Sequence, residues 1–238
     1  MTCMRNNRHF SALLFACYSN QQACLQVLFE HGKQLTSSDH ETFIKEWLGG
    51  KKEQIDALFY AVNHKNGDML SYLLRVIKLT SVVNSQNDDG ETLLHTAARI
   101  GSERIIFELA GDEPGFGGNV NSIDSVGNTP LHVAAESKQA SAARFLLSLG
   151  AELETRNNAG NTALHLAVQA ENLRTAKDLL LKGAERKARN ERNQVPGDFV
   201  DQIQDRQLKK SFKSALVSAF DRNSSYSLTN QLFNFVNI

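Results

Sequence analysis

The middle of the chain contains short hydrophobic runs that recur in pairs and are separated by polar, glycine-containing turns. Three segments begin such a pair: Gly90–Ala98, Gly127–Ala135 and Gly160–Val168. When each Thr (Thr92, Thr129, Thr162) is counted as position one, Leu stands at position three, Ala at six and Leu at eighteen. Such spacing is typical of helices with one apolar face. The pattern therefore predicts a helix–turn–helix unit that repeats after 37 and then 33 residues.

Weaker copies of the same unit flank these three. Two upstream copies begin at Ser11 and Asp56, and a partial downstream copy begins at Val195, where Gly197 and Asp198 replace Leu and His. We therefore predict about six units in one domain of residues 1–220. Its parts are strong repeats over 87–190, degenerate units over 10–32 and 53–78, and a capping unit over 190–220. A single unit cannot bury its apolar face alone, so the units are expected to stack.

Residues that favour turns and helix starts stand where each unit needs them. Asn87, Asp124 and Asn157 lie three residues before a Gly, which tolerates the positive φ of a tight turn. Each Thr is expected to cap its first helix by accepting backbone N–H groups. Gly150 and Gly183 are expected to end the second helices in the left-handed conformation.

One of these segments carries a specific motif. Thr129–Ala135 is Thr-Pro-Leu-His-Val-Ala-Ala, and Thr92–Ala98 and Thr162–Val168 match it with one or two departures. In these residues the chain resembles the ankyrin repeat family, over about residues 10–216 and most strongly over 87–190. The resemblance implies an all-α fold, an ankyrin-repeat solenoid of about six helix–turn–helix units with β-hairpin-like fingers and a concave helical face. It also implies a non-catalytic scaffold that recognises another protein.

The resemblance further implies where a partner protein would bind, because contacts in this family come from the finger tips and the exposed end of the first helix. The residues at those positions are Tyr18, His64, Asp89, Glu91, Arg99, Ile100, Val126, Asn128, Glu136, Ser137, Asn161 and Gln169. Arg99 and Ile100 occupy helix positions on the middle units, so we place them near the centre of the interface. The alternative for each residue is a side chain that is merely solvated.

Histidine and cysteine residues could in principle bind a metal ion or act in catalysis, but their spacing argues against both. His95, His132 and His165 recur once per unit, too far apart in a stack to share one metal ion. They are interpreted instead as a ladder of Thr–His hydrogen bonds that fixes the turns. Cys17 and Cys24 fall at inward helical positions, where thiols behave as small hydrophobic groups. No catalytic or nucleotide-binding motif is recognised, so we expect no enzyme activity, no cofactor and no metal.

Composition limits which classes of partner and which cellular compartment are expected. Lys plus Arg and Asp plus Glu both number 26, so the net charge is zero and extensive binding to nucleic acid or to an anionic membrane is not expected. Three cysteines without a CxxC pair suit a reducing cytosol. We therefore expect a monomeric cytoplasmic protein. Two alternatives stay open: the substrate-docking region of a larger enzyme, and a pathogen effector that acts on a host protein in the host cytosol.

Two segments lie outside the repeat pattern. Residues 38–48 begin with a capping-box pattern and continue with apolar residues at helical spacing, so they predict an inserted amphipathic helix that packs on the stack or presents Trp47 to a partner. Asp201–Phe220 predicts a helix that covers the last repeat. The tail over 221–238 ends in apolar residues. It is expected to dock on the stack, to lead into a further domain, or to contact a partner or a membrane.

Overall fold

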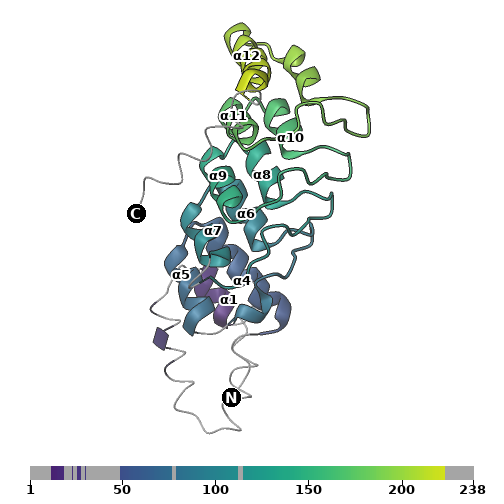
Figure 1. The fold of residues 1–238 in the computed structure, drawn as a ribbon. Helices are drawn as coiled ribbons and strands as arrows, with labels where there is room; N and C mark the ends of the chain where they lie inside the picture. Colours follow the sequence, from purple (N-terminus) through teal and green to yellow (C-terminus); the bar gives the residue numbers. More distant parts are fainter. Residues whose placement is uncertain are drawn as a thin grey trace. The chain divides into compact units, whose positions relative to one another are not determined.

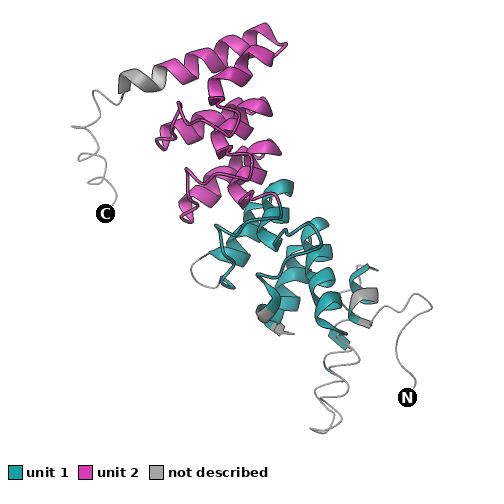
Figure 2. Cartoon of the chain, turned by 90° about the vertical axis from the view of Figure 1, so that its right-hand side faces the viewer, with its two compact units in different colours: residues 1–125 teal, residues 126–238 magenta. Residues whose placement is uncertain are grey.

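The computed structural model describes residues 12–18, 23, 26–27, 30, 49–76, 79–111 and 115–222. Over these residues the chain forms helices joined by turns and contains no β-strand, so the all-α prediction is confirmed (Figure 1). The predicted helix over 38–48 and the tail over 223–238 lie outside the described residues. The chain divides into two compact units, with the boundary between Ser125 and Val126 (Figure 2).

The first unit contains a row of first helices. Its described elements are α1 (Ala12–Tyr18), α4 (Lys51–Asn63), α5 (Gly67–Ser71), the π-helix η1 (Tyr72–Val76), the 3₁₀ helix η2 (Leu79–Val82), α6 (Leu93–Ile100) and α7 (Glu103–Ala110). Helix α4 packs between α1 and α6, and α5 contacts α7. The degenerate unit predicted over 53–78 therefore has a short second helix. It contains only five residues of α-helix before the hydrogen bonding changes to that of a π-helix.

The second unit contains the most regular pairs of helices. Its elements are α8 (Pro130–Glu136), α9 (Ala140–Ser148), α10 (Ala163–Gln169), α11 (Leu173–Leu181), the 3₁₀ helix η3 (Pro196–Gln202) and α12 (Arg206–Arg222). The first elements α8, α10 and η3 pack in one row, and α9, α11 and α12 pack in a second. This arrangement is the predicted stack of two-helix units.

The core of the second unit lies where the repeat positions place it. Leu131, Leu164 and Leu179 are at most 1% exposed, and Ala134 and Ala167 are fully buried. Because an alanine carries a single methyl group, neighbouring first helices approach closely at this position. Burying a leucine side chain contributes about 1.5–3 kcal/mol, so the repeated leucines are a main source of stability for the stack.

Fingers, the hairpin-like loops over 84–91, 121–128, 154–161 and 187–194, precede the first element of their units. In the second unit, the loops over 154–161 and 187–194 project from the same side of the helices (Figure 1). Gly160 has φ +73°, and a Cβ atom there would lie 2.7 Å from the backbone nitrogen of Glu191. The turn glycine is therefore required both by its backbone conformation and by the close approach of the next finger.

The C-terminal element begins later than predicted. The residues expected to form one helix from Asp201 divide between η3 and α12, which starts at Arg206. The carboxylate of Asp205 accepts the N–H groups of Gln207 and Leu208, both at 2.8 Å, and so fixes the start of α12. Phe212 is fully buried and α12 packs on α11 and η3, as expected of a helix that covers the last repeat.

Candidate functional site

Thr–His pairs form the framework from which the candidate site is built. The backbone N–H of Thr92, Thr129 or Thr162 donates to Nδ1 of the histidine three residues later, at 3.1, 3.2 and 3.1 Å. An Nδ1 atom that accepts an N–H carries no proton, so in the neutral ring the proton is on Nε2.

The other ring nitrogen links neighbouring units. Nε2–H of His132 donates to the carbonyl oxygen of Asn161 at 3.0 Å, and Nε2–H of His165 donates to that of Gln194 at 3.2 Å. Burial lowers the pKa of His165, which agrees with a neutral ring in this position. The interpretation of the histidines as a hydrogen-bond ladder is confirmed.

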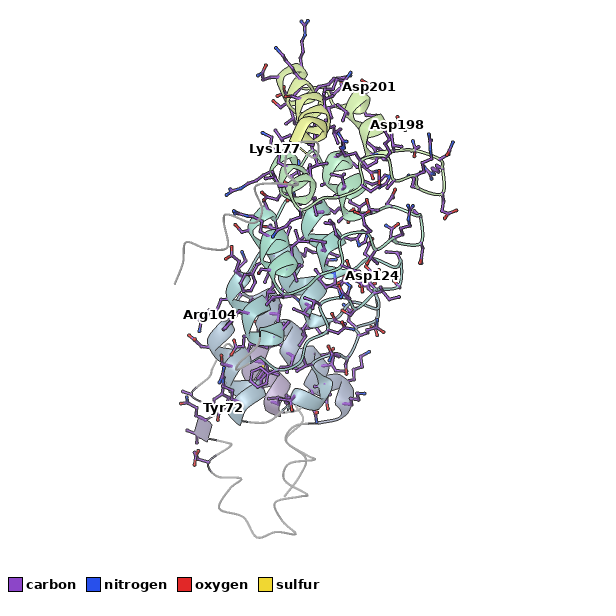
Figure 3. All side chains as sticks on the ribbon, in the orientation of Figure 1. Tyr72, Arg104, Asp124, Lys177, Asp198 and Asp201 are labelled. Carbon is purple, nitrogen blue, oxygen red and sulfur yellow. The ribbon has the colours of Figure 1, made fainter. Side chains whose placement is uncertain are left out.

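The last unit uses a different residue for the same bond. Asp198, in η3 (Figure 3), replaces the histidine, and its Oδ2 accepts the N–H of Val195 at 2.8 Å. A carboxylate accepts but cannot donate, so Asp198 reproduces only the half of the ladder that lies within a unit. This suits η3, because among the described residues it packs against α10 and α12, and no further first element of a unit follows it.

Asparagine side chains form a second ladder through the fingers. Oδ1 of Asn157 accepts the N–H groups of Ala159 and Asn161, both at 3.0 Å, and its Nδ2 donates to Oδ1 of Asn128 at 2.8 Å. Asn190 repeats this pattern and donates to Oδ1 of Asn161. Asn128 and Asn161, two of the predicted contact residues, therefore take part in holding the fingers together.

The predicted contact residues differ in how far they reach the surface. Exposed are Tyr18, His64, Asp89, Arg99, Val126, Glu136 and Gln169; half-buried are Ile100, Asn128, Ser137 and Asn161; buried is Glu91. Figure 3 shows the side chains along the fingers. The exposed residues occur in both units, at finger tips and at the ends of first helices.

Glu91 departs from the exposed finger position assigned to it. It is only 8% exposed, and both of its carboxylate oxygens accept from the guanidinium of Arg99. This hydrogen bond holds the pKa of Glu91 below its usual value, against the opposing effect of burial. Glu91 and Arg99 are therefore partners of each other, and the surface they present is mainly the guanidinium.

An aromatic cluster in the first unit joins two other predicted residues. The ring of Tyr60 stacks on His64 at 3.9 Å between centroids and meets Tyr18 edge-on at 4.6 Å. Its hydroxyl also donates to the carbonyl oxygen of Tyr18 at 3.2 Å. Tyr60 is not among the residues predicted from the sequence, although its spacing of four residues from His64 is a usable signal on a helix.

Alternative chemistries find little support in the described structure. Burial raises the pKa of Cys17 to about 12, so this thiol is not a ready nucleophile. Among the described residues, no group of three or more His, Cys, Asp or Glu side chains could hold a metal ion. The same part of the chain has no helix long and apolar enough to cross a membrane.

Comparison with known proteins agrees with the repeat geometry. A family model described as "Ankyrin repeats (3 copies)" matches residues 58–157 and 114–190. The chain is 43% identical over 74 residues to the tyrosine-protein kinase Shark of Drosophila melanogaster, a match that covers 31% of this chain and 8% of that protein. It is 32% identical over 140 residues to the nuclear factor NF-kappa-B p110 subunit of the same organism, covering 52% and 14%.

A third relative is closer in length. The probable 26S proteasome regulatory subunit p28 of Saccharomyces cerevisiae is 25% identical over 140 residues, which is 59% of each chain. In all three matches the chain covers less than two thirds of the relative's length. The chain therefore spans only part of the length of each of these relatives.

Proposed function

Since this chain belongs to the ankyrin repeat family, whose repeats generally mediate protein–protein interaction, we propose that it is a non-catalytic module that binds another protein. The contact surface comprises the finger tips and the ends of the first helices. The partner meets side chains that a fixed backbone presents, so little conformational entropy is lost on binding.

One observation carries this proposal: the backbone and asparagine groups of neighbouring fingers form hydrogen bonds with each other, and other side chains of the fingers face solvent. Adjacent fingers are joined by hydrogen bonds from Asn158 N–H to Val126 O at 3.0 Å and from Glu191 N–H to Ala159 O at 3.1 Å. The side chain of Val126 is nevertheless 54% exposed. An apolar side chain held on a braced tip offers a partner protein a contact that requires little ordering on binding.

Site-specific photocrosslinking tests the proposal. A photoreactive amino acid is placed at Val126 or Gln169, and in a matched control at Leu181, which is 70% exposed at the end of a second helix. After irradiation in a lysate of the source cells, the same protein is expected to be attached at the first two positions and not at the third. Adducts at Leu181 alone, or at none of the positions, would contradict the proposal.

A second candidate is that these repeats dock substrates for a larger enzyme. It is supported by the match to a protein named as a tyrosine kinase, of which the chain covers 8%. A catalytic segment in the same full-length product would separate this candidate from a free-standing module. The predicted cytoplasmic location, monomeric state and effector role stay predictions.

A further inference from the structure

The charges of this chain are unevenly distributed although they sum to zero. Residues 1–125 contain 11 Lys and Arg against 15 Asp and Glu, whereas residues 126–238 contain 15 against 11. The second unit therefore carries a net charge of +4. Between residues 182 and 192 there are five basic and two acidic residues, so much of the excess lies in and beside the last finger.

Two arginines occupy equivalent places in neighbouring fingers of this unit. Arg156 directly precedes Asn157, and Arg189 directly precedes Asn190. Nη1 of Arg156 donates to the carbonyl oxygens of Arg189 and of Gly160, the latter at 3.3 Å. Nη1 of Arg189 donates to the carbonyl oxygen of Asn193 at 2.8 Å and to its Oδ1 at 3.2 Å. Both guanidinium groups are thus anchored through one nitrogen to neutral oxygens.

Neither arginine is neutralised by these contacts. Both side chains are exposed, and neither forms an ion pair with a carboxylate of the described residues. Nε–H and Nη2–H form the side of a guanidinium that matches the two oxygens of a carboxylate. In both arginines these hydrogen bonds come from Nη1 alone. Each of the two adjacent fingers therefore presents one Nε–H and Nη2–H edge that can bind a carboxylate.

We propose that this arginine pair, Arg156 and Arg189, binds carboxylates of an acidic segment in a partner protein. The inference rests on the proposed function and names the chemistry of the partner. Anchoring through Nη1 limits the side-chain motion that is lost on binding. The exposed Lys187 and Arg192 of the same finger add attraction at longer range. A protein carboxylate is favoured over a nucleic acid because the whole chain is neutral and the excess of +4 is small for a polyphosphate.

The test uses the full chain and a fluorescein-labelled peptide of alternating Glu and Ser, with binding followed by fluorescence anisotropy in about 100 mM salt. The double variant Arg156→Gln/Arg189→Gln is expected to bind about tenfold more weakly. The matched control Arg174→Gln/Lys177→Gln removes the same charge from α11, where Lys177 lies away from the fingers (Figure 3). The control is expected to retain nearly full affinity, and equal losses in both variants would overturn the proposal.

A second double variant separates the effect of the paired guanidinium donors from the effect of positive charge. Arg156→Lys/Arg189→Lys keeps both charges but loses the paired donors, so it is expected to bind the peptide clearly more weakly than the natural chain. Undiminished binding by this variant would overturn the arginine pair as a specific site. Thermal unfolding of every variant checks that the fold is retained.

A last comparison addresses the kind of ligand. Oligouridylate RNA is titrated in parallel, and tighter binding of RNA with the same arginine dependence would overturn the choice of an acidic protein segment. Failure here is distinct from failure of the proposed function. If a protein crosslinks at Val126 but the acidic peptide does not bind, only the inference about Arg156 and Arg189 fails. If the peptide binds through the two arginines but no protein crosslinks at Val126, the proposed contact surface at the finger tips and first-helix ends is wrong, and the arginine pair remains a site for carboxylates.

Discussion

At the scale of single residues, side chains that look alike in sequence serve different purposes. His165 is buried and donates from Nε2 to the next finger, whereas His64 is exposed and stacks on a tyrosine. Both were candidate functional residues or ligands in the sequence. Their roles differ because one stands at the start of a first helix and the other follows the end of one.

The ladder predicts how stability depends on pH. Burial lowers the pKa of His165 below its usual 6.5, so below that pH the unfolded chain binds more protons than the folded chain. The contribution of His165 is therefore complete above pH 6.5 and is lost as the pH falls toward the folded-state pKa. Urea unfolding between pH 7.5 and pH 5 is expected to show a smaller loss of stability in His165→Gln than in the natural chain.

The pH range in which stability is lost and a control variant distinguish His165 from other titrating groups. Glu91 also has a lowered pKa, but its contribution is lost only as the pH falls below its usual 4.5. The variant His64→Gln, which changes an exposed ring, is expected to follow the natural chain. Identical pH profiles for His165→Gln and the natural chain, or a gain of stability on acidification, would refute the ladder's role.

The Glu91–Arg99 pair changes how the predicted centre of the interface is tested. Arg99→Ala leaves a buried carboxylate without its cation, so it is expected to lower the free energy of unfolding by about 1–3 kcal/mol. Ile100→Ala removes a half-buried side chain outside that pair and should affect folding less. If Ile100 lies in the interface, this variant weakens the crosslinked partner's binding about tenfold. Urea unfolding and titration calorimetry on both variants separate folding from binding, and unchanged affinity for Ile100→Ala would remove Ile100 from the interface.

At the scale of elements, the reversal between the first and second helix of a unit requires a residue with positive φ. Gly101 occupies it between α6 and α7 with φ +73°, but Lys138 and Glu171 occupy the same place in the second unit with φ +61° and +58°. A non-glycine residue in this conformation costs roughly 1–2 kcal/mol. The sequence alone does not reveal this strain, because neither Lys nor Glu is a typical residue for positive φ.

Glycine at this reversal is therefore expected to be stabilising. Lys138→Gly should raise the free energy of unfolding by up to about 1 kcal/mol, after the greater freedom of glycine in the unfolded chain is subtracted. Lys177→Gly, a matched change within α11, should lower it by about 1 kcal/mol. Urea unfolding measures both values, and equal destabilisation by the two variants would show that the reversal is not strained.

Prediction from sequence succeeded where the determinants are local. The turn glycines and the buried leucines follow from spacing within one unit, and the structure confirms them. Of the three expected Thr caps, only that of Thr129 is found, where Oγ1 accepts the N–H of His132 at 3.5 Å. Thr92 and Thr162 instead place Oγ1 at 2.9 Å from Nδ1 of the histidine three residues later.

Prediction failed where the outcome depends on a particular side-chain contact that lies outside the repeat pattern. The start of α12 depends on the cap at Asp205, and the burial of Glu91 depends on a guanidinium eight residues away. The cluster around Tyr60 depends on a contact between α1 and α4, which repeat positions do not encode.

At the scale of the whole molecule, a neutral chain is made of two units with opposite net charge. Composition alone argued against strongly charged partners, but the division into units shows where a basic surface and an acidic surface can form. Unequal charge directs which partners each unit attracts and how fast they associate, rather than how the chain folds. We therefore assign folding to the hydrogen-bond ladders, and recognition to the exposed side chains that take no part in them.

Amide hydrogen exchange, measured on the chain alone and in complex with the protein crosslinked at Val126, tests that assignment most directly. Binding is expected to slow exchange in the finger residues 154–161 and at the end of α10, and to leave exchange in α9 and α11 unchanged. Slower exchange in α9 and α11 without any change in the fingers would contradict it.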